Sequence, residues 1–459
     1  MNYKEIAKLF SNENVHFGIR GNGALWRYMK AEFERHFGDI TDINEFREKL
    51  FEIFNDITGC DLQLGSMVYV ELLDPGHGIS SGAVSLSWWY MIGIPVLCSR
   101  FNEHKSPYIS EEEFLKVTLP IAEKMMDNEC GKEYKYKKMM DREIMDLQKK
   151  ITSTIIGGAI GDALGVPVEF KPRGSFKVTD MIGYGTYNQP KGTWSDDTTM
   201  TLCLMENVIE GGDDEALMGK FLDWMENGYM TPHGKCFDIG GTTSRAIIEF
   251  KNGTLANQCG QFGEKDNGNG ALMRIAPVVF LNYKMESPQE RLATVERYSS
   301  LTHAHPRSIL GCFIYTECLR QLLLGKEKSQ AIGKAIEICD TRSSFEGTMF
   351  EARYENEFSH YSRILNGKIG SLEKDSIRSG GYVVDTLEAA LWCFLRNNSY
   401  EDTVLEAVNL GGDTDTTAIV AGSVAGMYYY DAIPEKWISS LAKIDNIKGL
   451  CRKFADAVQ

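Results

Sequence analysis

The sequence predicts a multidomain protein in which a compact all-α domain over residues 150–459 follows a smaller α+β domain over residues 1–145. Three observations support this fold class. The chain has 459 residues, which is more than one average domain contains. The run 131–150, GKEYKYKKMMDREIMDLQKK, is highly charged and is typical of a solvated helix or a linker. After it the sequence becomes small and apolar, helical periodicity dominates, and alternating strand patterns are scarce.

The first domain combines helical and strand patterns. The predicted elements are helices at residues 45–57 and 111–126 and strands at residues 66–73 and 94–98. The glycine-rich segments 20–26 (RGNGALW) and 75–82 (PGHGISSG) could form a small-molecule or nucleotide site, but turns between strands explain them more simply. This domain matches no family pattern, and recognition of a partner or substrate is a possible role for it.

The second domain is dominated by amphipathic or apolar helical patterns. These patterns predict helices at residues 152–164, 199–209, 215–225, 288–301, 308–323, 384–395, 400–410 and 416–429. Small residues recur every four positions in two of these segments, at Gly157, Gly161 and Gly165 and at Ala418, Gly422 and Gly426. Because glycine lowers helix stability, this spacing indicates close packing of helix backbones or a nearby ligand, with close packing the simpler explanation.

Composition restricts the partners of the chain. A net charge of −15 and a pI near 5.2 argue against nucleic-acid binding, which usually needs a basic face. The longest low-charge stretch, residues 417–430, is too short to cross a membrane. The eleven cysteines show no zinc-site spacing and are typical of reduced thiols, and the N-terminal residues lack the apolar core of a signal peptide. We therefore expect a cytoplasmic protein with no membrane or nucleic-acid partner.

Two acidic clusters of matching design each lie directly before an apolar helix. The first is TWSDDTT at residues 193–199, and the second is GGDTDTT at residues 411–417. One such cluster alone would be explained as a helix N-cap. Carboxylates flanked by hydroxyls are also the hard oxygen ligands that Mg²⁺ and Mn²⁺ require. Since four unpaired carboxylates would repel one another, the two clusters together favour a binuclear metal site formed by Asp196, Asp197, Asp413 and Asp415.

Four other features could contribute to a site. The glycine-rich turn NGNGALMRIAP at residues 267–277 could present backbone N–H groups to phosphate, although an ordinary loop is the default explanation. In LTHAHPR at residues 301–307, the histidines fit substrate contacts better than metal ligation. Glu169 follows a glycine-rich helix and could face a metal site. Asp238 precedes a glycine turn, where a simple N-cap is a serious competitor.

Taken together and in order, these segments resemble the ADP-ribosylglycohydrolase family, typified by the enzyme that reactivates dinitrogenase reductase. The matching blocks cover roughly residues 152–440 and are GAIGDALGVPVEF, TWSDDTTMTL, FDIGGTT, NGNGALMRIAP, LTHAHPRS, SGGYVVDTLEAALWCFL and AVNLGGDTDTTAIVAGSVAGMYY. The resemblance implies a compact all-α fold with two Mg²⁺ or Mn²⁺ ions in a cleft. The tyrosine run 428–430 departs slightly from the family, which commonly has a glycine there.

The resemblance also implies roles for individual residues. The implied metal ligands are Ser195, Asp196, Asp197, Asp413, Asp415 and Thr416, with serine replacing the usual threonine at the first position. The implied catalytic carboxylates are Asp238, which is associated with the arginine-specific branch, and Glu169. The implied substrate contacts are Asn269, Gly270 and His303.

We therefore expect a hydrolase that cleaves an N- or O-glycosidic bond of ADP-ribose on a protein side chain, most plausibly arginine, or on a small acceptor. The metal ions would hold the ribose 2″ and 3″ hydroxyls and a water, while Asp238 or Glu169 would transfer protons. Two other functions stay open. The chain could act as an immunity or binding protein that engages an ADP-ribosylating toxin through residues 1–145. It could also be a metal-dependent phosphoesterase, which would release AMP.

Overall fold

The computed structural model describes residues 15–20, 67–73, 80–88, 95–101, 129–340 and 353–458, with side chains from Asp146 onward. The chain divides into two compact units, Met1–Glu143 and Ile144–Gln459. Each unit is described by itself.

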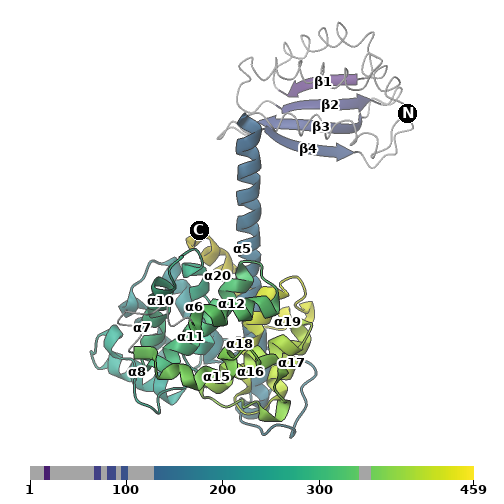
Figure 1. Cartoon of the computed structure of the whole chain (residues 1–459). Coiled ribbons are helices and arrows are strands. Elements are labelled where there is room, and N and C mark those ends of the chain that lie inside the picture. The colour runs from purple at the N-terminus through teal and green to yellow at the C-terminus, as the bar shows by residue number, and fades with distance from the viewer. Residues whose placement is uncertain are drawn as a thin grey trace. The chain divides into compact units, whose positions relative to one another are not determined.

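The first unit contains a four-stranded antiparallel sheet in the order β1-β2-β3-β4 (Figure 1). Its strands are β1 Val15–Arg20, β2 Met67–Leu73, β3 Ser80–Trp88 and β4 Pro95–Phe101. The expected strands at 66–73 and 94–98 correspond to β2 and β4. The glycine- and serine-rich segment between them is not only a turn, because residues 80–88 form β3 and pair with both neighbours. The expected helices at 45–57 and 111–126 lie outside the described residues.

The second unit is helical, and its described residues contain no β-strand beyond isolated bridges. Its longer helices are α5 Glu129–Gly165, α6 Asp196–Ile209, α7 Asp214–Asn227, α8 Gly241–Lys251, α10 Pro288–Ser300, α11 Pro306–Leu323, α12 Lys328–Asp340, α16 Val383–Arg396, α17 Tyr400–Asn409, α18 Thr414–Tyr428 and α20 Ile444–Ala457. Its short helical elements are η1 Val166–Val168, η2 Gly185–Tyr187, η3 Ala256–Gln258, η4 Leu272–Arg274, α9 Val278–Asn282, η5 Glu357–Tyr361, α15 Ser362–Leu365, η6 Ile369–Ser371, η7 Lys374–Ser376 and α19 Glu435–Ile438. The expectation of an all-α domain is confirmed, and each of its eight expected helices is present.

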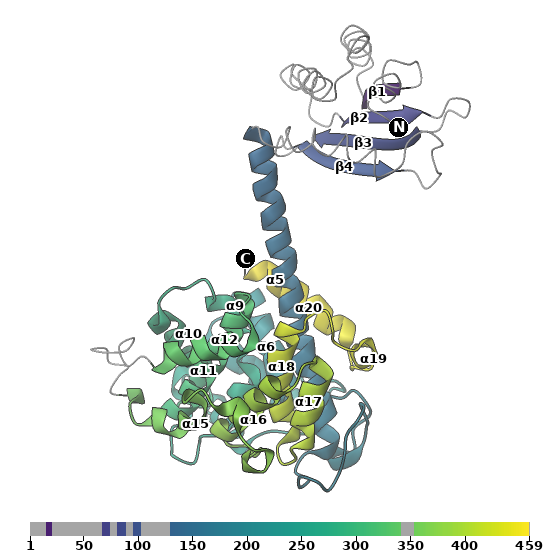
Figure 2. The same ribbon diagram turned by 45° about the vertical axis from the view of Figure 1, so that its right-hand side comes forward.

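The most buried helix is α18, in which every residue from Thr414 to Met427 is buried. It packs against α11, α16 and α17, as Figures 1 and 2 show. Its small residues face those of α5 at backbone contact distance. A Cβ atom added to Gly161 would lie 2.1 Å from the Ala418 carbonyl oxygen, and one added to Gly165 would lie 2.4 Å from the backbone of Asp415. Helix packing therefore accounts for the glycine spacing, and it places the end of α5 against the start of α18.

One described segment, Asp146–Val168, is long and apolar enough to cross a membrane by length and composition alone. From the sequence alone, only residues 417–430 were compared with the length of a membrane-spanning helix. Within the helical unit, 94% of the most apolar window of this segment is buried. Burial of this extent is what a core helix of a folded domain requires, and the contacts with α18 explain the apolar composition.

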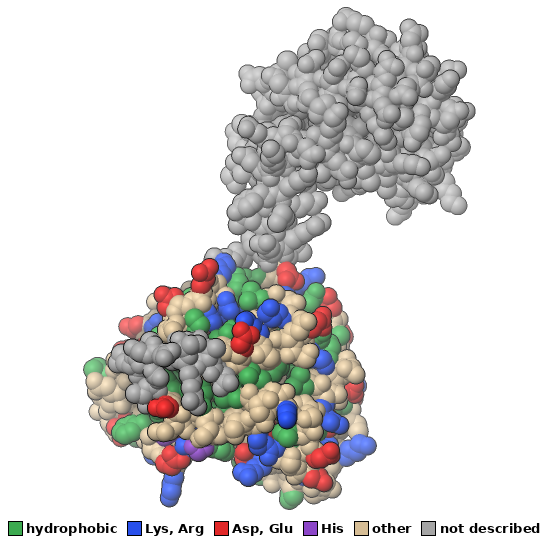
Figure 3. All heavy atoms as spheres, viewed as in Figure 1, with side chains coloured by type: hydrophobic (Ala, Val, Ile, Leu, Met, Phe, Trp, Pro, Cys, Tyr) green, Lys and Arg blue, Asp and Glu red, His purple; other side chains and the backbone are tan. Residues whose placement is uncertain are grey.

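Charged side chains of both signs are interspersed on the face of the helical unit drawn in Figure 3. On this face the described residues form no continuous basic surface of the kind that nucleic acid requires.

Candidate active site

The two acidic clusters begin two helices, yet their aspartates are not used as N-caps. Ser195 is the N-cap of α6, and its hydroxyl accepts the backbone N–H of Asp197 at 3.3 Å. Asp413 occupies the N-cap position of α18 but makes no capping hydrogen bond with its side chain. The capping explanation therefore holds for Ser195 and leaves the carboxylates of the clusters free for another purpose.

The start of α6 is held by a carboxylate that the sequence analysis did not single out. Asp162 of α5 is fully buried and accepts the backbone N–H of Ser195 at 2.9 Å and that of Thr198 at 3.1 Å. It also accepts the Thr198 hydroxyl at 2.6 Å. A carboxylate at a helix N-terminus is stabilised by the helix dipole. Asp162 therefore fixes the position of Asp196 and Asp197 relative to α5.

The start of α18 is set by its two preceding glycines. Gly411 and Gly412 both have φ near +74°, a conformation that favours glycine. The Gly412 N–H donates to the Lys171 carbonyl, and its own carbonyl accepts the Phe170 N–H at 2.7 Å. This tight entry brings Asp413 close to the segment that carries Glu169.

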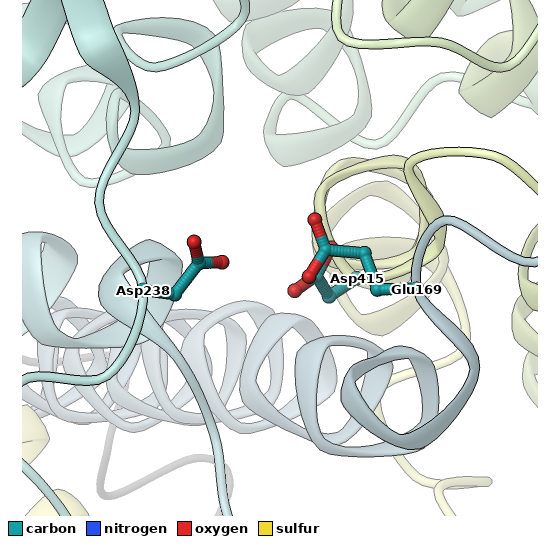
Figure 4. A group of neighbouring side chains, drawn as sticks. All are labelled: Glu169, Asp238 and Asp415. Carbon is teal, nitrogen blue, oxygen red and sulfur yellow. The ribbon is translucent and has the colours of Figure 1, made fainter. Parts of the chain in front are cut away.

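A pocket of about 290 Å³ brings together most of the expected site residues. Its lining includes Glu169, Asp196, Asp197, Asp238, Asn269, Gly270, His303, Asp413 and Thr416. Asp415 lies beside it, since carboxylate oxygens of Glu169, Asp238 and Asp415 all fall within 4.8 Å of one another. In Figure 4 Glu169 and Asp415 lie side by side, and Asp238 faces them from the opposite wall. Ser195 is buried and is not among the lining residues.

Several carboxylate oxygens at this pocket are buried without a hydrogen-bond partner. They are Glu169 Oε2, Asp197 Oδ2, Asp413 Oδ1 and Asp415 Oδ2. A buried carboxylate oxygen without a donor is costly unless a cation compensates it. No Lys or Arg side chain is among the residues that line the described pocket. An all-oxygen set of this kind fits Mg²⁺ or Mn²⁺.

The crowding of these carboxyl groups raises their pKa values. Burial is the largest cause for Asp196, Asp197 and Asp415, whose pKa values lie well above the ordinary range. Repulsion by neighbouring carboxylates adds to the increase in each case. Burial, followed by the charge of Asp238, raises the pKa of Glu169 to about 8. Without a cation, the site therefore favours protonated carboxyl groups.

This electrostatic state predicts how the stability of the metal-free protein depends on pH. The folded-state pKa of Glu169, about 8, lies above its unfolded value. Protonation of Glu169 therefore raises the free energy of unfolding. This contribution is fully present below about pH 4 and is lost as the pH rises through 8. We expect a lower free energy of unfolding at about pH 8.5 than at about pH 5.5, measured by urea titration in chelator.

The control for this pH prediction is Glu169→Gln, which cannot ionise at this position. Its free energy of unfolding should fall less over the same pH interval than that of the wild-type protein. If the free energy of unfolding of the two proteins depends equally on pH, the raised pKa of Glu169 is contradicted.

Tyr187 lies beside the two expected catalytic carboxylates. Burial raises the pKa values of Glu169 and Asp238, and the nearby Tyr187 phenol lowers both. Burial is the largest of several causes that keep the Tyr187 phenol protonated by raising its pKa. A neutral phenol at this place can donate a hydrogen bond to a carboxylate. No pattern in the sequence marked Tyr187, because it ends the short helix η2, which is too brief to show a periodic pattern.

The expected substrate contacts lie at the pocket but are partly engaged by the protein itself. The Asn269 side-chain amide donates to Asp413 Oδ2 at 2.9 Å and to Thr386 at 3.0 Å. Its backbone N–H donates to the Gly381 carbonyl at 3.1 Å, so the turn cannot offer that group to phosphate. Asn269 thus orients Asp413 as well as lining the pocket.

His303 packs against the same turn. Its Nδ1 is hydrogen-bonded to the Thr302 hydroxyl at 2.8 Å. A Cβ atom added to Gly270 would lie 2.8 Å from the imidazole Cε1 atom, so glycine is required for this contact. Burial, aided by Arg274 and Arg245, lowers the pKa of His303 to about 3, and the ring is therefore neutral at physiological pH.

The fold and the pocket together define a helical protein with a buried, carboxylate-rich pocket. The chain belongs to the ADP-ribosylglycohydrolase family, whose family model matches residues 143–459. It is accordingly a hydrolase of the ADP-ribosyl glycohydrolase type.

Two relatives and a solved structure illustrate what this chain is similar to. The ADP-ribosylarginine hydrolase Tri1 of Serratia proteamaculans is 33% identical over 309 residues, covering 66% of this chain and 78% of the relative. The ADP-ribosyl-[dinitrogen reductase] glycohydrolase of Rhodospirillum rubrum is 28% identical over 296 residues, covering 62% and 88%. A solved structure described as an ADP-ribosylglycohydrolase-related protein complex superposes with a TM-score of 0.57 at 28% identity, covering 69% of this chain and 100% of that one.

Proposed function

We propose that this enzyme removes ADP-ribose from modified arginine side chains of proteins and that it requires divalent cations. The unpartnered carboxylate oxygens at the pocket support the metal part of this proposal, because no Lys or Arg side chain is among the described residues that line the pocket. The arginine part is supported by Asp238 at the pocket wall and by the arginine specificity that the names of two relatives state.

The proposed cations are two Mg²⁺ or Mn²⁺ ions. The residues that would hold them are Ser195, Asp196, Asp197, Asp413, Asp415 and Thr416. When bound, such cations supply positive charge that holds ribose hydroxyls and lowers the pKa of a water molecule. The same charge would offset the acidic surroundings of a pyrophosphate-bearing substrate.

The protein's own groups supply orientation and proton transfer. Asp238 and Glu169 face one another across the pocket, and the Tyr187 phenol lies near both. Either carboxylate could accept a proton from the attacking water or return one to the leaving group. Asn269 keeps Asp413 in place, and His303 supports the turn at Gly270 as a neutral ring. The remaining N–H groups of that turn would contact the phosphates.

The family match begins at residue 143, so most of the first unit lies outside it. We propose that this unit engages a protein partner, such as an ADP-ribosylating toxin, and that the protein acts in the cytoplasm.

Product analysis tests the proposed reaction. Peptides that carry ADP-ribose on arginine or on serine are incubated separately with the enzyme in Mg²⁺ or Mn²⁺, and the products are separated by mass spectrometry. We expect intact ADP-ribose from the arginine peptide and little from the serine peptide. Release of AMP would indicate a phosphoesterase, and selective cleavage of the serine peptide would contradict the arginine assignment.

A further inference from the structure

A second cavity, of about 660 Å³, adjoins the carboxylate pocket. Two segments form its walls, and its lining residues are Thr186, Tyr187, Gln189, Pro232, His233, Lys235, Cys236 and Phe237. None of these residues was given a role by the sequence analysis. The volume falls within the range of ordinary small-ligand sites.

The two cavities share a wall made of Tyr187 and the segment around Asp238. Tyr187 lines the second cavity, and its phenol is close enough to Glu169 and Asp238 of the first to affect the pKa of both. The Thr186 hydroxyl donates to the backbone carbonyl of Glu169 at 2.9 Å, and this bond holds the Thr186–Tyr187 segment against the first pocket. A group that leaves the sugar near Asp238 is therefore next to the second cavity.

The order of residues along the segment 236–243 indicates how the substrate would be oriented across the two cavities. Cys236 and Phe237 line the second cavity, and Asp238 through Thr243 line the first. The end of this segment adjoins the glycine-rich turn, because a Cβ atom on Gly270 would lie 2.9 Å from the Thr243 hydroxyl. If that turn receives the phosphates, the second cavity lies at the opposite end, beyond the carboxylates.

We infer that the second cavity binds the acceptor part of the substrate, namely the modified arginine side chain and its adjoining peptide residues. This inference rests on the proposed function. The Tyr187 and Phe237 rings lie with centroids 5.2 Å apart at an interplanar angle of 54°. Aromatic faces bind a planar guanidinium group well.

Lys235 adds a preference for acidic peptide sequences. It is exposed at the cavity, and it forms no ion pair with any residue that the structure describes. A free ammonium group there would attract a carboxylate next to the modified arginine. The cavity therefore selects both the modified side chain and its neighbours.

Two variants with different readouts test the acceptor site. Phe237→Ala should lower kcat/KM for an ADP-ribosylarginine peptide by about 10-fold. The affinity for free ADP-ribose and for Mn²⁺, measured by calorimetry, should stay unchanged. Lys235→Glu should reverse the preference, by about threefold in each direction, between peptides with glutamate or with lysine beside the modified arginine. A disturbed fold would not reverse a charge preference.

Tyr430→Ala is the matched control, because Tyr430 is a half-buried aromatic residue that lines a different cavity beyond the far end of α18. It lies roughly 20 Å from the start of that helix. If wild-type enzyme releases no ADP-ribose from the arginine peptides, the proposed function fails and the acceptor site fails with it. If wild-type enzyme is active and both test variants match Tyr430→Ala, the acceptor site alone is overturned.

Discussion

Removal of divalent cations with a chelator is expected to abolish release of ADP-ribose, lowering turnover by at least about 1000-fold. The physical reason is the group of buried carboxylate oxygens at the pocket that no protein donor contacts. Without cations these carboxyl groups repel one another or take up protons, and neither state supplies the positive charge that activates a water molecule. The measurement is free ADP-ribose released from an arginine-modified peptide after exhaustive chelation.

Adding back Mg²⁺ or Mn²⁺ should restore turnover, and it should also raise the melting temperature. Saturation at about 100 times the dissociation constant stabilises a folded protein by about 2.7 kcal/mol. K⁺ at the same ionic strength is the control, and it should neither restore turnover nor raise the melting temperature. Full activity in the chelated protein, with its metal content verified as zero, would contradict the metal requirement.

Replacement of Asp197 or Asp413 by alanine is expected to abolish turnover. Asp197→Ala should do so without lowering the stability of the metal-free protein, whereas Asp413→Ala also removes the acceptor of the Asn269 amide. Asp197 is buried, and its Oδ2 has no partner. Its Oδ1 accepts only a long hydrogen bond, at 3.4 Å, from Thr416. Because burial and like-charge repulsion disfavour its ionised form, the alanine variant loses little and relieves repulsion.

The measurement for this prediction is the melting temperature of each variant with and without Mn²⁺. Both variants should lose the increase that Mn²⁺ causes, and metal-free Asp197→Ala should melt at or above the wild-type temperature. Asp456→Ala is the control, since Asp456 is an exposed carboxylate in α20, and it should match the wild-type protein in both respects. Metal-free Asp197→Ala protein that melts well below wild-type protein would show that Asp197 is structural.

The helices of the second unit could be predicted from sequence because their apolar positions recur with helical period. Each predicted helix begins and ends within a few residues of the observed one, except that α5 begins at Glu129 and not at residue 152. There the charged run 131–150 belongs to the same helix as the glycine-rich segment, since α5 extends from Glu129 to Gly165. The sequence changes from charged to apolar along this helix, but the helix itself continues without a break.

The carboxylates of the pocket could be found from sequence because each lies in a short local motif. Their supporting groups could not, because support comes from residues distant in the chain. Asp162 reaches Ser195 across 33 positions, and the Asn269 amide reaches Asp413 across 144. Tyr187 lies in the three-residue helix η2, which is too short for a periodic pattern, and only the fold brings it near Glu169.

The glycine-rich turn at residues 267–277 is a second case in which contacts with distant residues could not be predicted from the motif. The motif predicted free backbone N–H groups, but the structure uses that of Asn269 to bond Gly381. A local pattern indicates which groups could bind a ligand. The groups that remain available depend on what packs against the turn.

The most direct test of the central claim is ADP-ribose release by purified Asp413→Ala protein whose metal content has been measured and shown to be reduced. The substrate is the arginine-modified peptide with Mg²⁺ or Mn²⁺ present. We predict no release above the rate without enzyme, although the protein remains folded. Turnover like that of the wild-type enzyme at reduced metal content would contradict a metal-dependent site at these aspartates.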